Sequence, residues 1–90
     1  MSEVDAEFEV MAEDELARAC TLSWRELIKV TPWGDTYEGF APSGQAVEVE
    51  RNYLWADAPG GDVLVEVVVS KNKVLYDSGA RRVRIIPAPR

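Results

Sequence analysis

The run of β-branched residues from Val63 to Val69 limits the possible folds of this chain more than any other stretch. Valines stand at alternate positions, 63, 65, 67 and 69, and therefore share one face of an extended strand. Branched side chains lose rotamer freedom in a helix and pack well on a pleated sheet. Leu64 and Val68 flank Glu66 on the other face, which predicts a central strand covered on most of both faces.

The residues that follow this strand predict further antiparallel pairing. A polar break at residues 70–73 and a second apolar run make residues 62–77 typical of a β-hairpin. After a turn or bulge at residues 77–80, residues 81–86 alternate again, with Val83 and Ile85 expected inward and Arg82 and Arg84 outward. The prolines at positions 87 and 89 end the sheet, because proline cannot donate to a ladder.

Two turns divide the middle of the chain into further short strands. Residues 31–35 and 42–45 are rich in Pro, Gly, Ser and Asp and predict turns, which leaves strands at 36–41 and 46–56. In the second of these, one face is apolar and only Arg51 interrupts it. The apolar positions of that face are Val47, Val49, Tyr53 and Trp55.

The N-terminal segment alternates strictly between acidic and apolar residues. The odd positions are acidic, and they are Glu3, Asp5, Glu7 and Glu9. A strand over residues 3–10 would present these carboxylates on one face about 6.6 Å apart, a spacing that resembles that of backbone phosphates. The alternative is an N-terminal tail in which only Phe8 docks on the core.

Residues 12–20 and 21–30 differ in how clearly they specify an element. Residues 12–20 predict a short amphipathic helix of about two turns, with acids in its first turn and Leu16 and Cys20 on one face. Residues 21–30 contain a capping box, Ser23 to Glu26, but also alternate like a strand. The strand is favoured there, because evenly spaced turns follow and indicate a meander.

These elements together predict a single domain over residues 1–90. The chain is 47% hydrophobic, which is sufficient for a packed core. The expected class is α+β: a small antiparallel meander of about five or six short strands, as a curled sheet or an open barrel, with one short helix.

Composition argues against several kinds of chemistry. The chain has no histidine and one cysteine, Cys20, so a disulfide framework is excluded and a metal site is not expected. No phosphate-binding, dinucleotide-binding or nucleophile-elbow motif is present, and we expect neither a cofactor nor enzymatic activity. There is no basic and apolar leader and no apolar run near the roughly 18 residues of a membrane span. A cytoplasmic protein without membrane attachment is therefore expected.

Charge is divided unevenly along the chain. Residues 1–15 carry seven acids and no base, whereas residues 67–90 carry six bases and one acid. One interpretation is that the two ends are neighbours and pair, with the N-terminal acids against Arg82 and Arg84. The other is an acidic surface for a basic partner. Direct nucleic-acid binding through the C-terminal bases is not expected, because the net charge is −6.

The expected function is that of a small acidic module that binds a protein partner. The residues expected to bind the partner combine the acidic N-terminal segment with an aromatic turn: Glu3, Asp5, Glu7, Glu9, Glu13, Asp14, Trp33 and Asp35. In size, acidity and lack of a catalytic set, the chain is similar in kind to small phage-encoded inhibitors of host defence complexes, such as anti-CRISPR proteins. That resemblance implies a basic nucleoprotein complex as partner.

A second function stays open at this point. The chain is also compatible with an accessory subunit of a virion or a multi-subunit assembly that pairs through a sheet edge. The oligomeric state is not predicted.

Overall fold

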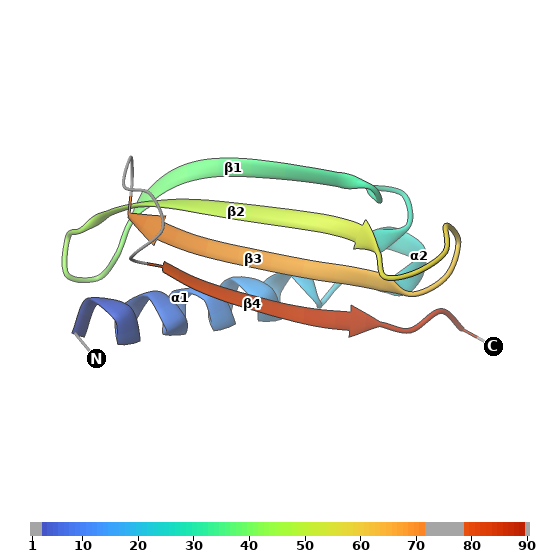
Figure 1. The fold of residues 1–90 in the computed structure, drawn as a ribbon, viewed down its shortest axis with the longest axis horizontal. Coiled ribbons are helices and arrows are strands. Elements are labelled where there is room, and N and C mark those ends of the chain that lie inside the picture. The colour runs from blue at the N-terminus through green and yellow to red at the C-terminus, as the bar shows by residue number, and fades with distance from the viewer. Residues whose placement is uncertain (1–2, 72–78, 90) are drawn as a thin grey trace.

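The computed structural model describes residues 3–71 and 79–89, with side chains from residue 6 onwards. Two helices precede four strands: α1 (Glu3–Ala19), α2 (Trp24–Leu27), β1 (Trp33–Phe40), β2 (Ala46–Trp55), β3 (Val63–Lys71) and β4 (Gly79–Ile86). The strands form one antiparallel sheet in the order β1-β2-β3-β4, and α1 runs along its β3–β4 side (Figure 1). The α+β class and the antiparallel sheet are confirmed, with four strands in the described residues in place of the expected five or six, and with two helices there in place of one short helix.

The valine face of β3 forms the centre of the core. Its four alternating valines, Val63, Val65, Val67 and Val69, are fully buried, as the sequence predicts. On the opposite face, Leu64, Glu66 and Val68 are only half-buried. The expectation that both faces are covered is therefore wrong for this second face, because the helix packs on the valine face alone.

The N-terminal residues belong to a helix, and the prediction of a strand over residues 3–10 is wrong. α1 also includes most of the short helix expected at residues 12–20, and begins nine residues earlier. The helix buries residues spaced three or four apart, which are Phe8, Ala12, Leu16 and Ala19. A strand would have buried Val10 with Phe8, whereas Val10 is 60% exposed. The segment forms a helix rather than a strand because the helix places four apolar residues on the sheet.

The segment 21–30 is also helical at its centre, so the favoured strand is wrong there. Both bonds of the capping box are present: the Glu26 backbone N–H donates to Ser23 Oγ at 3.3 Å, and the Ser23 N–H donates to Glu26 Oε1 at 3.2 Å. Trp24 fixes this turn to the far end of the sheet, since its Nε1–H donates to the Gly61 carbonyl at 2.9 Å. Leu27 is fully buried beneath it.

The remaining strands lie close to their predicted positions. β2 confirms the expected strand at 46–56, with Arg51 on its buried face. β1 begins at Trp33, three residues before the predicted strand, so the turn predicted at 31–35 is wrong for residues 33–35, which pair with β2. The second arm of the predicted hairpin falls within residues 72–78, outside those that the structure describes. β3 pairs along its length with β4.

β4 is a strand as predicted, but its two faces are reversed. Arg82 lies opposite Val67 and Arg84 opposite Val65, on the side of the sheet that α1 covers. Ile85 lies on the other side and is 54% exposed. The reversal has a physical cause, because α1 supplies carboxylates that bond with Arg82.

The molecule is elongated, with principal extents of 43 × 19 × 19 Å, and its termini lie at opposite ends (Figure 1). One layer is helical and the other is the sheet. We call the side of the sheet opposite α1 the open face; it carries Thr36, Glu38, Glu48, Glu50, Asn52, Leu54, Leu64, Glu66, Val68, Arg81, Val83 and Ile85. Neither helix in the described part of the chain has the length and apolar character needed to cross a bilayer.

Candidate functional site

The helix covers only part of the valine side of the sheet. α1 packs on β3 and β4 and leaves the β1 side open (Figure 1). Between them lies a cleft of about 180 Å³, which we call the α1–β1 groove. Its lining comes from the helix and from the first two strands: Met11, Asp14, Glu15, Arg18, Tyr37, Gly39, Phe40 and Val49.

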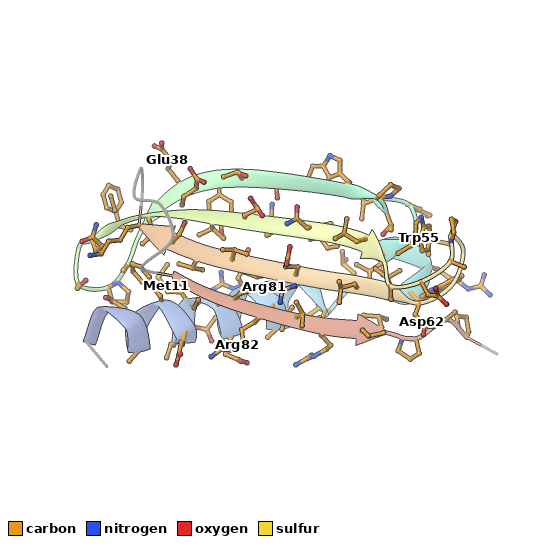
Figure 2. The ribbon with its side chains drawn as sticks, in the orientation of Figure 1. Met11, Glu38, Trp55, Asp62, Arg81 and Arg82 are labelled. Atoms are coloured by element: carbon orange, nitrogen blue, oxygen red, sulfur yellow. The ribbon has the colours of Figure 1, made fainter. Side chains whose placement is uncertain are left out.

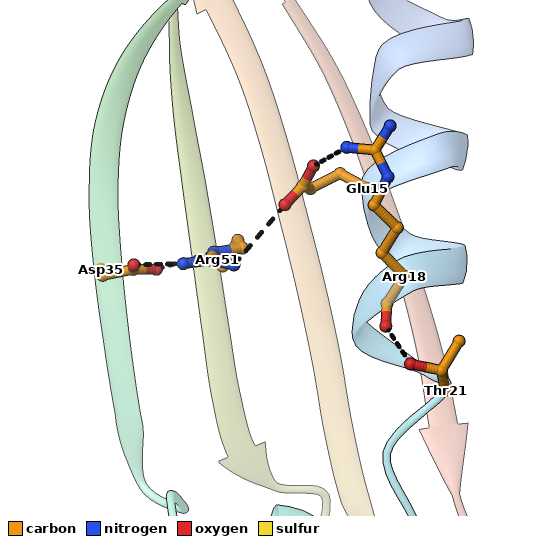
Figure 3. Close-up of polar contacts among 5 residues, drawn as sticks. All are labelled: Glu15, Arg18, Thr21, Asp35 and Arg51. Atoms are coloured by element: carbon orange, nitrogen blue, oxygen red, sulfur yellow. Dashed lines mark hydrogen bonds and ion pairs between the residues drawn. The ribbon is translucent and has the colours of Figure 1, made fainter.

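A chain of ion pairs runs from β1 to the helix side of this groove, where Glu15 and Arg18 belong to the lining. Asp35 and Arg51 lie directly opposite each other in the β1–β2 register, and two N–H groups of Arg51 donate to the two carboxylate oxygens, the Nε–Oδ1 distance being 2.9 Å. Arg51 NH1 also lies 3.6 Å from Oε1 of Glu15, whose Oε2 accepts a bond from Arg18 at 3.2 Å (Figure 3). The chain thereby connects β1, β2 and α1.

Partial burial makes these contacts stronger than ordinary surface pairs. The side chains of Arg51 and Asp35 are 29% and 28% exposed, and that of Glu15 is 11% exposed. A bidentate arginine–carboxylate pair with limited hydration has a fixed geometry. The hydrogen bond to Asp35 raises the pKa of Arg51 above its ordinary value, so this guanidinium stays charged. Arg51 is held in place by β1 and α1 together.

Two aromatic residues of β1 lie beside the ion pairs and remain exposed. Trp33 stacks on the buried ring of Tyr53, with ring centroids 6.0 Å apart and an interplanar angle of 15°, and is itself 49% exposed. Tyr37 is 39% exposed, and the Arg51 guanidinium carbon lies 5.3 Å from its ring centroid. Burial, followed by the nearby charge of Glu15, raises the pKa of Tyr37, so its hydroxyl is a neutral donor. Trp, Tyr and Arg are the residues most enriched in the anchors of protein interfaces.

The structure places three of the residues predicted to bind a partner on the side of the sheet that carries α1. Asp14 lines the α1–β1 groove, whereas Trp33 and Asp35 stand on β1 outside its lining, and Trp33 lines a separate cleft with residues 29–32. Glu13 faces the other way, toward β4, where it accepts a bond from Arg82 at 2.6 Å. The predicted set is therefore divided between two sides of α1.

The acidic N-terminal residues do not form the predicted row. Residues two apart on a helix are separated by about 200°, so the odd positions cannot share one face. Glu7 accepts bonds from the backbone N–H and the hydroxyl of Ser43 at 2.6 and 2.8 Å, and Glu9 lies 3.7 Å from Arg82. Glu3 and Asp5 are in the first turn of α1, and their side chains lie outside those that the structure describes.

Sequence reasoning missed the residues that give the groove its shape. Glu15 and Arg18 were not among the predicted site residues, and neither were Tyr37 and Arg51. The available signal was Arg51, a lone charge on an otherwise apolar strand face, since such a residue needs a buried partner. No signal pointed to Glu15, because its neighbours on the helix are equally acidic.

The described side chains offer little for metal or thiol chemistry. Within residues 6–71 and 79–89, no group of three or more His, Cys, Asp or Glu side chains is arranged to hold a metal ion. Cys20 is half-buried, and burial raises its pKa despite the lowering effect of Arg84, which keeps the thiol protonated at neutral pH. The groove is thus a surface for contacts made by aromatic rings and fixed charges.

No family model, curated protein sequence or solved structure matches this chain.

Proposed function

We propose that the protein is a small, acidic, non-enzymatic binding module that recognises a protein partner through the α1–β1 groove and the neighbouring residues Trp33 and Asp35 of β1. The observation that carries this proposal is the exposure of Trp33 and Tyr37 beside a fixed arginine. Large aromatic side chains in such a setting bury much area on contact and have few torsions to immobilise.

The groove is preorganised for binding. The ring of Trp33 rests on Tyr53, which is only 5% exposed, and Arg51 is held by carboxylates from two elements. Side chains that are already held lose little conformational freedom when a partner arrives. A rigid anchor of this kind favours recognition of a defined protein surface.

Charge supports a basic partner. The protein has a net charge of −6, and the groove region holds three carboxylates against two guanidinium groups. Exposed Asp14 stands at the rim, where its charge can attract cations. The more specific form of the proposal is an anti-CRISPR-like inhibitor that occupies the nucleic-acid-binding surface of a host defence complex.

Affinity capture with matched variants tests the groove. The wild-type chain should retain a protein from a lysate of the host cell, and Trp33→Ala should lower its recovery at least tenfold, because the variant removes the aromatic anchor. Val10→Ala is the control, since Val10 is 60% exposed and is not among the residues that line the groove. Equal recovery with all three chains would rule out Trp33 as the anchor, and equal recovery with Tyr37→Ala as well would rule out the groove, which Tyr37 lines.

The acidic form of the proposal has a kinetic test. Binding should weaken with added salt, and Asp14→Asn should slow association, because charge at the rim steers a basic partner over about 8 Å at physiological ionic strength. The double variant Glu7→Gln/Glu9→Gln is the comparison: both residues already contact Ser43 or Arg82, so it should lower stability modestly and leave association unchanged. An unaltered association rate with Asp14→Asn would contradict the basic partner.

A second function is supported by the edges of the sheet. The outer edges of β1 and β4 have no partner strand among the described residues, so either could accept a strand from a neighbouring subunit. In that case the edge amides of β1 or β4 should exchange more slowly with solvent in the complex. Binding through the groove should leave the exchange of both edges unchanged.

A further inference from the structure

The open face of the sheet is apolar at one end. In the strand register Leu54 lies opposite Leu64, and Leu64 lies opposite Ile85, so the three side chains form one row across β2, β3 and β4. Leu54 is 39% exposed and Ile85 54%, and Val83, two residues along β4, is 43% exposed. Adjacent aliphatic side chains on one side of a sheet form a continuous patch, and such patches mark contact surfaces.

Next to this row, the polar residues of the open face satisfy one another. Asn52 Nδ2 donates to Glu66 Oε1 at 2.9 Å, and Arg81 Nε donates to Glu66 Oε2 at 2.5 Å (Arg81 is labelled in Figure 2). Both oxygens of the central carboxylate therefore have a partner within the chain. A covering layer could be placed over this network without leaving an unpaired charge, which is the main cost of burying ionised groups.

We propose that the open face packs against the open face of a second copy of this chain, forming a two-layer sandwich with α1 on the outside of each layer. Sheets that pack in this way keep their strands within about 30° of one another. A twofold axis parallel to the strands places each row opposite the same row of the other copy. The apolar row then faces its own counterpart, and the strand order is reversed.

The same rotation keeps the acids of the open face apart. These are Glu38, Glu48, Glu50 and Glu66, and the last already bonds with Arg81 of the same copy. With the strand order reversed, Glu48 lies over Ser70 of the other copy, Glu50 over Val68, and Glu66 over Asn52, so that none of these carboxylates directly opposes another. The twofold axis repeats each of these pairings, so a second copy can cover the face without placing acid on acid.

The available area is sufficient for a weak dimer. Four strands at about 4.8 Å spacing and 8 to 10 residues at about 3.3 Å rise give a footprint of roughly 500 Å² per copy. Two such faces bury on the order of 1,000 Å², which is the lower limit for a specific interface. Dissociation in the micromolar range is therefore expected.

Sedimentation equilibrium of the full chain tests the dimer. The wild-type protein should have the mass of two chains at 100 μM and should dissociate on dilution. Ile85→Asp should weaken self-association at least tenfold, because it places a charge in the apolar row. Val10→Asp is the matched control: Val10 is an equally exposed aliphatic residue on α1, and its variant should remain a dimer.

A second measurement needs no variant and so stays informative if Ile85→Asp does not fold. The methyl NMR signals of Leu54, Leu64 and Ile85 should shift with protein concentration, while those of Val10 should not. A wild-type chain that is monomeric at 100 μM with constant methyl signals would overturn the proposal. Open-face signals that shift only when another protein is added would overturn it too, and would assign this face to that protein. Neither outcome depends on Trp33, so the groove is tested separately.

Discussion

At the scale of single residues, Arg51 is a charged residue on a buried strand face, and its contacts explain how the fold accommodates it. It stands on the buried side of β2, bonds with Asp35 and Glu15, and lies over the ring of Tyr37. A charge in that position is tolerated because its partners come from both neighbouring elements. Removing it would leave the partly buried carboxylate of Asp35 without a cation and Glu15 with only the exposed Arg18, which is the costly way to break an ion pair.

We therefore predict that Arg51→Met lowers the free energy of unfolding by about 2–4 kcal/mol. Arg18→Ala serves as the control, because Arg18 bonds with the same Glu15 but its side chain is 75% exposed, and exposed pairs contribute about 0.5 kcal/mol or less. Urea denaturation of the two variants measures both values. Equal losses would show that burial does not distinguish the two arginines.

Glu66 gives a prediction on pH. Burial alone would raise its pKa, but hydrogen bonds from Asn52 and Arg81 outweigh that effect and lower the pKa below its ordinary value of 4.5. The unfolded chain thus binds the proton more readily than the folded one, so this carboxylate stabilises the fold above pH 4.5 and stops doing so as pH falls through the lowered pKa.

Glu66→Gln should accordingly be less stable than the wild type at pH 7, by about 1–2 kcal/mol, because neutral hydrogen bonds replace charge-assisted ones. The difference between the two proteins should shrink as the pH is lowered below 4.5. Denaturation at pH 7 and at pH 3 measures it. A difference that is the same at both values would refute the lowered pKa.

At the scale of elements, α1 is held by one apolar stripe. Phe8 is fully buried in the core, whereas Val10, on the same helix, is 60% exposed. Isolated helices of this length are marginal in water, so the packing of the stripe on β3 and β4 supplies most of the stability of α1.

Phe8→Ala should therefore destabilise the protein by about 3–5 kcal/mol, the range for truncating a buried aromatic side chain. Val10→Ala should change stability by no more than about 0.5 kcal/mol, as expected for an exposed position. Thermal melts and urea titrations of the two variants compare them directly. A large loss of stability with Val10→Ala would instead support a strand over residues 3–10, in which both Phe8 and Val10 are buried.

At the scale of the whole molecule, stability should come from the single core between α1 and the sheet, without a bound metal. We expect that a chelator leaves the melting temperature unchanged, because no set of metal ligands is gathered in the described residues. Differential scanning calorimetry with and without the chelator measures this. A shift of several degrees would mean that a metal contributes to folding.

How much of the fold was predictable depended on whether the pattern of a segment has one structural meaning. The stretch Val63–Val69 has a single period and a β-branched composition, and its strand was predicted with the correct buried face. Residues 3–10 fit both the strand period and the helix period, because Phe8 is buried in either element. The strand that was predicted from them was wrong. Of the residues at the candidate site, Asp14, Trp33 and Asp35 were among those predicted to bind a partner, a role that stays a prediction, while Glu15 and Arg18 were not.

The sequence by itself determined β2, β3 and the turn at residues 42–45, since strand alternation and turn chemistry act over a few residues. Only the tertiary structure decided that residues 3–10 are helical, because that choice depends on burying Phe8, Ala12 and Leu16 together on the sheet. It also decided the faces of β4. Arg82 lies on the helix side because it bonds there with Glu13, which is 69 residues earlier in the chain. A pattern of neighbouring residues cannot predict a contact over that separation.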